Sequence, residues 1–379
     1  MLKCSKEMQN MSIKRPSLNI GIEEEYQIIN PQTRELSSYI TQILEGDHSI
    51  LRELSIKPEL HQSTLEVGTK VCDTVQDARK ELVRLRSMVS DLAKKDGMRI
   101  AAAGTHPFSV WQTQEITPLD RYQGLLEDLQ ELARQTLIFG MHVHIGIEDQ
   151  DFMVDAMNTL KYMIPHVLAL STSSPFWEGR NTGLKSYRIA MFRRFPRTGI
   201  PGDFSSYGDY ENFIDVMVQT GSIPNSSKIW WDVRPHHSFP TLEFRICDLC
   251  TNVDDAVCCA ALFQALVLKH YKMRKDNISF RRYPINMIDE NKWRAFRYGI
   301  DGKMIDFGRE VELPTKELIT ELVAFVDDVV DDLGSRKEVE HALKIIERGS
   351  SANQQLEIFK ETGDVKNVVD WLIEETVRF

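Results

Sequence analysis

The sequence predicts an α+β fold in which helices cover a sheet, with a helical part at the C-terminal end. Segments that alternate between apolar and polar residues, typical of strands with one buried face, recur before residue 250. From Asp254 onward, apolar residues recur mainly at helical spacing. Because no repeat or long linker divides the chain, we expect an N-terminal extension over residues 1–17 and a single domain over residues 18–379, helical from about residue 311.

The first predicted strand covers residues 18–29, and its polar face carries Glu23 and Glu25. Two carboxylates on one strand face lie about 7 Å apart. When they are partly buried they repel each other unless a cation lies beside them. Glu24 lies on the apolar side, which the pattern does not explain. An edge strand with a solvated acidic face is the alternative interpretation.

Two further predicted strands place ionisable side chains on their polar faces. One carries Glu66, and Glu59 precedes it by seven residues. The other covers residues 139–147, where His142 and His144 lie opposite the apolar side chains. Such a pair of imidazoles suits a metal ion or a phosphate group. Two polar residues on a solvated face are the alternative.

Helices are predicted between and after these strands. Residues 74–95 have apolar side chains at helical spacing, and Gly97 is suited to end this helix. Residues 151–170 form a helix that Pro165 should kink or divide. Later helices are predicted over residues 256–272, 288–298, 315–333, 339–348 and 368–378.

Residues 171–204 are rich in basic and aromatic side chains, although the net charge of the protein is −10. Glycines and prolines make this segment loop-like. A concentration of arginines favours a pocket for phosphate or carboxylate groups, whereas a surface loop whose arginines pair with nearby acids is the alternative. The basic side chains are Arg180, Lys185, Arg188, Arg193, Arg194 and Arg197, and the aromatic ones include Trp177 and Tyr187.

Residues 228–234 and 241–247 are predicted as a pair of strands joined by a six-residue link. Arg234 lies on the polar face of the first strand, and Glu243 and Arg245 share the polar face of the second. A carboxylate and a cation therefore lie together on one strand face.

The composition argues against a nucleic-acid surface, because 56 acidic residues outnumber 46 basic ones. The first ten residues lack the apolar core of a secretory signal, and no stretch reaches 18 apolar residues. Together with the scattered cysteines, these features predict a cytoplasmic protein without membrane contact. Cys247 and Cys250 form an isolated C-x-x-C motif, which is weak support for zinc or redox chemistry.

If the four strands with ionisable side chains are neighbours in an antiparallel sheet, their polar face carries four carboxylates and a histidine. Such a surface would bind two or more divalent cations, and its oxygen ligands favour Mg²⁺ or Mn²⁺ over Zn²⁺. Arg245 and the basic segment would supply positive charge for phosphate groups. The sequence has no P-loop and no glycine-rich dinucleotide loop, so any nucleotide site is of another kind.

Five motifs occur in order along the chain: GIEEEY at 21–26, GMHVH at 140–144, SSPFWEGR at 173–180, WWDVRP at 230–235 and NKWRAFRYG at 291–299. Together they resemble the bacterial glutamate–cysteine ligase type 2 family, whose members are described as carboxylate-amine ligases. The resemblance covers residues 18 to about 310, and residues 311–379 rest on helical pattern alone.

This resemblance implies a curved, mainly antiparallel sheet of the glutamine synthetase catalytic-domain type. It also implies an ATP-dependent carbon–nitrogen ligase that uses Mg²⁺ or Mn²⁺. ATP would phosphorylate a substrate carboxylate, and an amine would displace phosphate from the acyl phosphate to form an amide. The implied substrates are a glutamate-like carboxylate and a cysteine-like amine or other amino acid. A homodimer is a common state of large cytoplasmic enzymes.

The resemblance also assigns roles to residues. The implied metal ligands are Glu23, Glu25, Glu66, His142 and Glu243. The implied nucleotide contacts are His144, Arg245 and Glu25. The candidates for substrate binding are Arg180, Arg188, Trp177 and Tyr187, and those for catalysis are Arg245, Arg234 and Arg194.

Two other functions fit the same residues. A metal-dependent amide hydrolase would use the acidic surface without a nucleotide. A protein that binds a nucleotide or metabolite with little turnover would keep the ligands without the reaction.

Overall fold

The structure is a computed structural model that describes residues 13–40 and 56–379. In these residues a seven-stranded sheet has the order β10-β11-β5-β1-β3-β2, with β4 also paired to β1. Every pair in it is antiparallel. Its strands are β1 (Ile20–Ile29), β2 (Lys57–Pro58), β3 (Thr64–Gly68), β4 (Arg99–Ala101), β5 (Met141–Gly146), β10 (Val233–Pro235) and β11 (Thr241–Phe244).

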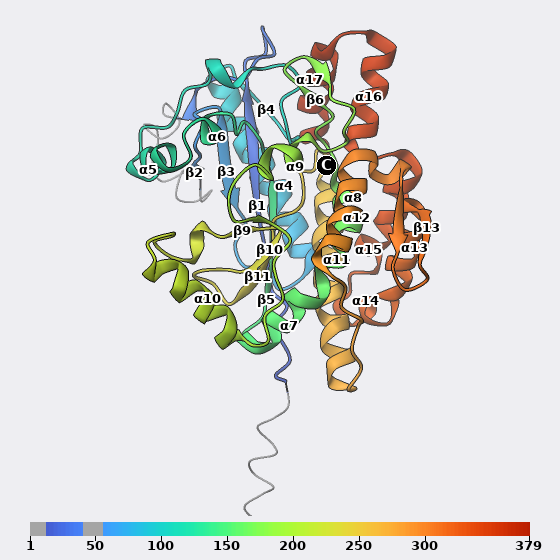
Figure 1. Cartoon of the computed structure of the whole chain (residues 1–379). Coiled ribbons are helices and arrows are strands. Elements are labelled where there is room, and N and C mark those ends of the chain that lie inside the picture. The colour runs from blue at the N-terminus through green and yellow to red at the C-terminus, as the bar shows by residue number, and fades with distance from the viewer. Residues whose placement is uncertain (1–12, 41–55) are drawn as a thin grey trace, which may run out of the picture.

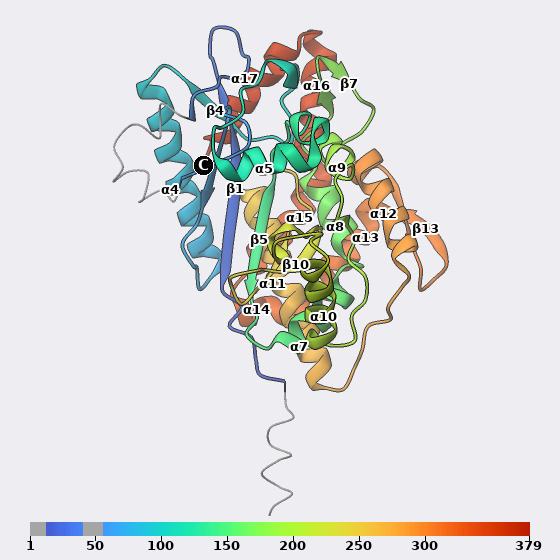
Figure 2. The same ribbon diagram turned by 60° about the vertical axis from the view of Figure 1, so that its left-hand side comes forward.

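One face of this sheet is covered by two long helices. Helices α4 (Val75–Lys95) and α11 (Val253–Lys275) pack against each other and against β1, and α4 runs beside β1 in Figures 1 and 2. The alternation of β1 buries its apolar side chains, such as Ile20 and Ile22, on this side. The opposite face of β1 carries Glu23 and Glu25, so the sheet separates a hydrophobic core from a polar surface.

The remaining C-terminal helices lie at the right and top of Figure 1, where some pack on α11, and the last two pack on each other, the final one also against β4. One hydrophobic core extends from Leu18 to Leu372 and joins them to the sheet. These helices are α12 (Ile285–Tyr298), α13 (Thr315–Phe325), α14 (Asp327–Leu333), α15 (Arg336–Arg348), α16 (Ser351–Thr362) and α17 (Val365–Thr376).

The structure confirms several predicted elements. Thr74 caps α4 by accepting a hydrogen bond from the Asp77 backbone, and Gly97 follows its end with a φ of 75°. The helix predicted over residues 151–170 is divided into α7 (Gln150–Leu160) and α8 (Ile164–Ser171), because Pro165 lies in the first turn of α8.

Other predictions need correction. The strand predicted over residues 228–234 is split, because β9 (Trp230–Trp231) pairs with β8 (Thr198–Gly199) outside the central sheet, whereas β10 pairs with β11. The helix predicted over residues 315–333 is two helices, α13 and α14. The segment predicted to be loop-like, residues 171–204, contains a short helix, α9 (Tyr187–Phe192), as well as strands.

The sequence did not indicate α10 (Tyr207–Gln219), α16 or the hairpin of β12 (Lys303–Asp306) and β13 (Val311–Pro314). Among the described residues, the other short elements are α5 (Asp120–Leu129), α6 (Glu131–Arg134), β6 (Phe176–Trp177), β7 (Arg180–Asn181) and three 3₁₀ turns at Trp111–Thr113, Ser226–Lys228 and Gly299–Asp301.

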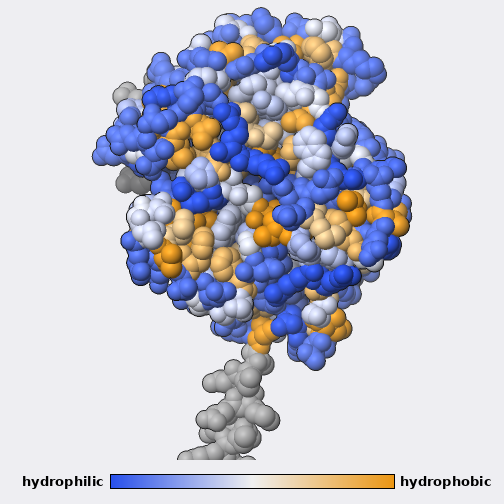
Figure 3. Space-filling view, viewed as in Figure 1, coloured by the Kyte–Doolittle hydropathy of each residue, from blue (hydrophilic) through white to orange (hydrophobic). Residues whose placement is uncertain are grey.

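The predicted class, an antiparallel sheet covered by helices with a helical C-terminal part, is confirmed. Most of the predicted N-terminal extension lies outside the described residues. None of the helices described here is long and apolar enough to cross a membrane. Hydrophilic residues dominate the face shown in Figure 3, with hydrophobic patches between them.

Candidate active site

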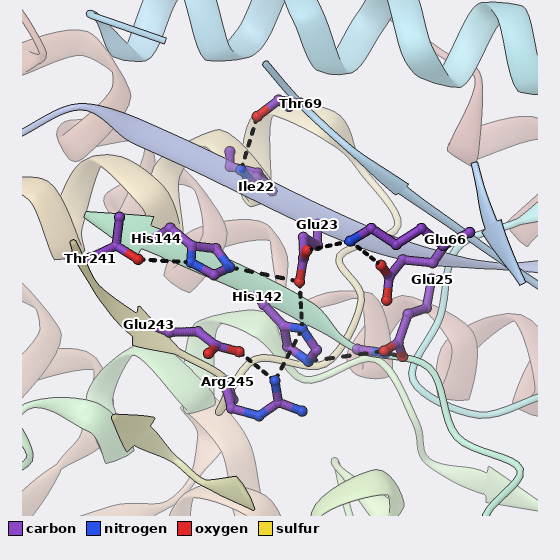
Figure 4. Close-up of polar contacts among 12 residues, drawn as sticks. Ile22, Glu23, Glu25, Glu66, Thr69, His142, His144, Thr241, Glu243 and Arg245 are labelled. Carbon is purple, nitrogen blue, oxygen red and sulfur yellow. Dashed lines mark hydrogen bonds and ion pairs between the residues drawn. The ribbon is translucent and has the colours of Figure 1, made fainter. Parts of the chain in front are cut away.

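The polar face of the sheet gathers ionisable side chains from four strands (Figure 4). Directly opposite residues in an antiparallel pair point to the same face. The register places Glu25 opposite Glu66, Glu23 opposite His142, and His144 opposite Glu243. The pairing of strands far apart in the sequence therefore brings these side chains together, as the alternation on each strand predicted.

Glu23, His144 and Glu243 form the tightest group, which we call the cation cluster. Each offers one ligand atom, and these atoms lie within 4.8 Å of one another. His144 Nδ1 lies 3.1 Å from Thr241 Oγ1, and this contact orients the ring. His144 Nε2 is buried without a hydrogen-bond partner and lies 3.7 Å from Glu23 Oε2. Two carboxylates and an imidazole nitrogen free to coordinate are a donor set that fits Mg²⁺ or Mn²⁺.

His142 lies beside this cluster. Its Nδ1 is 3.3 Å from Glu23 Oε2, and its Nε2 is 4.0 Å from Glu25 Oε1. Burial and the nearby charge of Arg245 lower the pKa of His142 to about 4. Burial raises the pKa of the Glu23 carboxyl, but its interactions with His142 and His144 outweigh this effect and hold it well below its usual range. Glu23 is therefore expected to stay ionised.

Three further carboxylates, those of Glu25, Glu59 and Glu66, lie close together on the same face, near β3. Burial and the charge of Glu66 raise the pKa of Glu25 to about 7, although Arg188 acts in the opposite direction. Burial and the charges of Glu66 and Glu25 raise the pKa of Glu59 well above its usual value. Lys57 Nζ lies 2.9 Å from both Glu23 Oε1 and Glu66 Oε1. A protein cation thus bridges two of the predicted metal ligands, which shows the demand for positive charge here.

Two buried arginines bind Glu243. Arg234 Nε donates to Glu243 Oε2 at 2.8 Å, and Arg245 donates to Glu243 Oε1. Burial raises the pKa of Glu243, but the charges of Arg245 and Arg234 lower it well below its usual value. Arg188 donates to the backbone carbonyls of Arg245 and Ile246 at 3.3 and 3.4 Å. The Nε–H groups of Arg188 and Arg245 are buried without an acceptor among the described residues, so both can bind an anionic group.

The other sequence candidates lie differently. Trp177 is buried and its ring packs on Tyr187, with centroids 5.2 Å apart. Arg180 is 77% exposed and lies near Glu178, whereas Arg194 is exposed and donates to Gln135. Neither Arg180 nor Arg194 has a described contact with the cation cluster.

Two cavities flank the cluster. The Phe239 cavity, about 410 Å³, has Glu23, Lys57 and His144 on its wall, together with apolar residues that include Val71, Phe239 and Pro240. The His61 cavity, about 160 Å³, has Glu25, His142, Arg188 and Arg245 on its wall, together with Glu59, His61 and apolar side chains. Lys57, Thr241 and His61 were not predicted as site residues, because only the strand register shows that they reach this surface.

Comparison with known proteins places this fold and site in the class of glutamate–cysteine ligase-like proteins. The sequence profile of glutamate–cysteine ligase family 2 matches residues 19–370, so the chain belongs to this family.

Relatives in several bacteria support the assignment. A protein named "Putative glutamate--cysteine ligase 2" from Roseiflexus sp. strain RS-1 is 57% identical over 358 residues, which cover 94% of each chain. A protein of the same name from Solibacter usitatus is 50% identical over 370 residues, 97% of this chain and 96% of the relative.

Solved structures show the same fold. Glutamate–cysteine ligase from Francisella tularensis, solved in complex with AMP, aligns with a TM-score of 0.69 at 12% identity, over 97% of this chain and 90% of that one. A bifunctional glutathione synthetase from Pasteurella multocida aligns with a TM-score of 0.67 at 14% identity, over 95% of this chain and 52% of that one.

Proposed function

We propose that the protein is an ATP-dependent carboxylate-amine ligase that forms an amide through an acyl phosphate. The cation cluster lies between two cavities, each of which also has a basic side chain on its wall, and this arrangement is the main support for the proposal. Family membership supports glutamate as the carboxylate and cysteine as the amine. The structure solved with AMP is of a protein with the same fold, which supports a nucleotide as the phosphoryl donor.

The Phe239 cavity is the proposed nucleotide site. Its apolar wall suits a planar base, and Lys57 and His144 lie at its border with the cluster. Glu23, His144 and Glu243 would hold a divalent cation, which would neutralise charge on the phosphate oxygens. Glu25 and Glu66 are proposed to add ligands for a second cation, because their crowded carboxylates are difficult to keep ionised without one.

The His61 cavity is the proposed site of the carboxylate substrate. The Nε–H groups of Arg188 and Arg245 have no acceptor among the described residues, and both arginines line this cavity. A guanidinium here can position the substrate carboxylate and stabilise negative charge as it is transferred. Arg234 acts through Glu243 and Arg245, so it is a positioning residue in this proposal.

The proposed amide-forming reaction has two steps. A carboxylate oxygen of the substrate bonds to the γ-phosphorus as the bond from that phosphorus to the ADP oxygen breaks. The amine nitrogen bonds to the acyl carbon, the bond from that carbon to the phosphate oxygen breaks, and one amine proton is released. The buried arginines stabilise the charge that moves in both steps, and the apolar walls limit access of water to the acyl phosphate.

The test is a phosphate-release screen of the purified protein with ATP, Mg²⁺ or Mn²⁺, glutamate and a series of amines. We expect phosphate release that requires the carboxylate and the amine together. In Arg245→Ala the rate of phosphate release should fall by about 100-fold or more, because one charged contact that stabilises the transition state is lost. Arg193→Ala is the matched control, because Arg193 pairs with Asp289 at an exposed site outside both cavities. If no combination consumes ATP, the proposal is wrong.

The hydrolase alternative makes the opposite prediction. Amide cleavage would proceed without ATP, and Arg245→Ala would leave it nearly unchanged. Tight nucleotide binding without phosphate release in any mixture would instead support the binding-protein alternative.

A further inference from the structure

The His61 cavity has two chemically different sets of lining side chains. One set is charged or ionisable and lies on the side of the cavity that faces the cation cluster. It consists of Glu25, Glu59, His142, Arg188 and Arg245. The other set is apolar and consists of Leu60, Leu125, Ile138, Phe192, Phe195 and Trp230. A glutamate-like substrate has no apolar group large enough to fill the second set. The apolar lining therefore points to a different part of the reaction.

His61 is the unusual polar residue of this lining. Its side chain is 3% exposed, and neither ring nitrogen makes a hydrogen bond of normal geometry with a described residue, although the Thr136 backbone is close. Burial lowers the pKa of His61 to about 4, so the imidazole is neutral at pH 7. A neutral imidazole has one donor and one acceptor, and leaving both unused in a buried site is costly.

The local fold explains why His61 stays in this position. It forms a β-bridge with Ile116 and precedes β3, the strand that carries Glu66. The His61 ring is thus fixed to the same sheet as the cation cluster. A ligand that satisfies the ring would be held at a set distance from the reacting groups, which favours a role in substrate positioning.

We propose that the apolar part of the His61 cavity binds the side chain of the amine substrate, and that His61 selects an uncharged side chain that carries one hydrogen-bonding group. This inference rests on the proposed function. The cysteine thiol is the smallest member of this class, with a weak donor for the ring nitrogen. A charged side chain that enters the apolar part would lose its hydration against these six residues, because Glu25 and Glu59 belong to the other set of lining residues.

The experiment compares amines with the wild-type enzyme under saturating ATP, Mg²⁺ and glutamate. The amines are cysteine, 2-aminobutyrate, in which a methyl group replaces the thiol, and lysine. We expect kcat/KM for cysteine to exceed that for 2-aminobutyrate by about 10-fold, because 2-aminobutyrate cannot make the buried hydrogen bond with His61. Lysine should support no measurable turnover.

The variant His61→Leu keeps an apolar side chain of similar size. We expect the preference for cysteine over 2-aminobutyrate to fall to about one, through a higher KM for cysteine, while the KM values for ATP and glutamate stay within about twofold. His166→Leu is the matched control, because His166 is equally buried and has an unpartnered Nδ1 but lines neither cavity. Its amine preference should equal that of the wild type.

The outcomes separate the inference from the proposed function. If the wild type releases no phosphate with any amine, the proposed function fails and the inference fails with it. If the wild type is active but uses lysine as well as cysteine, or if active His61→Leu keeps the wild-type amine preference, the inference alone is overturned. If His61→Leu does not fold, the wild-type series of amines decides.

Discussion

Arg86 on α4 and Glu24 on β1 form an ion pair in which both side chains are fully buried, with Arg86 Nη2 2.5 Å from Glu24 Oε1. The same guanidinium donates to the backbone carbonyls of Cys250, Thr251 and Thr376. One side chain therefore links the central strand, the segment before α11 and the end of α17. This network explains why an acid lies on the apolar side of β1, between the two site carboxylates.

Replacing Arg86 should destabilise the fold strongly. Arg86→Met leaves the Glu24 carboxylate buried without its counter-charge, and removing one partner of a buried pair typically costs about 3–5 kcal/mol. We expect a loss of this size in the free energy of unfolding, measured by urea denaturation monitored by circular dichroism. Glu24→Leu combined with Arg86→Met should recover part of the loss, because no unpaired charge remains.

A comparison with a surface pair tests the role of burial. Arg336 binds Asp331 at an exposed site on α15, where water replaces the lost contact. Arg336→Ala should unfold at nearly the wild-type urea concentration. If Arg86→Met did the same, the buried network would not be a main support of the fold.

The geometry of the cation cluster leads to a prediction about which histidine would be a ligand of a bound metal ion. Of the two on β5, His144 offers an atom to the group with Glu23 and Glu243, whereas His142 is positioned between carboxylates and Arg245. His144→Asn should weaken Mn²⁺ binding by at least about 10-fold, because replacing a metal ligand, or a residue that orients one, typically lowers metal affinity by this much. His142→Asn should weaken it less. Electron paramagnetic resonance of free Mn²⁺ in titrations measures both, and equal losses would contradict the assignment.

Glu23→Gln provides a positive control for this titration. Glu23 lies in the cation cluster and is held ionised, so its loss should reduce Mn²⁺ affinity as much as the loss of His144. Lys57→Met is expected to raise the affinity, because the lysine that now bridges Glu23 and Glu66 no longer competes with the metal ion.

The position of Gly140 leads to a prediction about the proposed site of the carboxylate substrate. A Cβ atom at this position would collide with the guanidinium of Arg188, and the Gly140 backbone N–H donates to Glu25 Oε2 at 2.5 Å. Gly140→Ala should displace Arg188 and raise the KM for the carboxylate substrate about 10-fold or more, with a smaller effect on the KM for ATP. Steady-state kinetics with each substrate varied separately measures this difference.

Gly124 offers a matched substitution. It lies within α5, and a Cβ atom there meets nothing within 4 Å. Gly124→Ala should leave all KM values unchanged and stabilise the protein by about 0.5–1 kcal/mol, because alanine is the better helix residue. If Gly140→Ala behaved like Gly124→Ala, the contact of Arg188 with the Gly140 backbone would not matter for binding.

Much of the site was predictable from the sequence, because strand alternation alone fixes which side chains share a face. Glu23, Glu25 and Glu66 illustrate this. The partner of Glu24 was not predictable, since Arg86 lies on a helix 62 positions later. The proximity of His144 to Glu243 was not predictable either, because it depends on the register between β5 and β11.

Two other features could not be read from the sequence, for local reasons. The exposed positions of Arg180 and Arg194 depend on the path of a segment whose composition alone suggested a pocket. Helix α16 fully buries only the small or polar Ser351, Ala352 and Gln355, whereas its larger apolar side chains Leu356 and Phe359 are only partly buried, so its pattern is weak. Gln355 instead donates to the Ser173 backbone carbonyl at 2.8 Å.

The last prediction concerns the acid sensitivity of the fold, through the buried His106. Its Nδ1 accepts hydrogen bonds from the backbone N–H groups of Phe108 and Ser109 at 3.2 and 2.8 Å, and its Nε2 lies 2.9 Å from the Arg34 carbonyl. These contacts require a neutral ring protonated at Nε2. Burial lowers the pKa of His106 to about 3, whereas in the unfolded chain it is about 6.5.

Below pH 6.5 the unfolded chain therefore binds a proton that the folded protein excludes. The stability from His106 is fully present above pH 6.5 and decreases as the pH falls toward 3, by about 2 kcal/mol at pH 5. His106→Asn keeps an acceptor for the two N–H groups but cannot titrate, so its free energy of unfolding should fall less between pH 7 and pH 5. Between pH 7 and pH 8, where His106 is neutral in both states, the variant and the wild type should show the same pH dependence in urea denaturation. An equally steep acid decline in His106→Asn would assign the sensitivity to other groups.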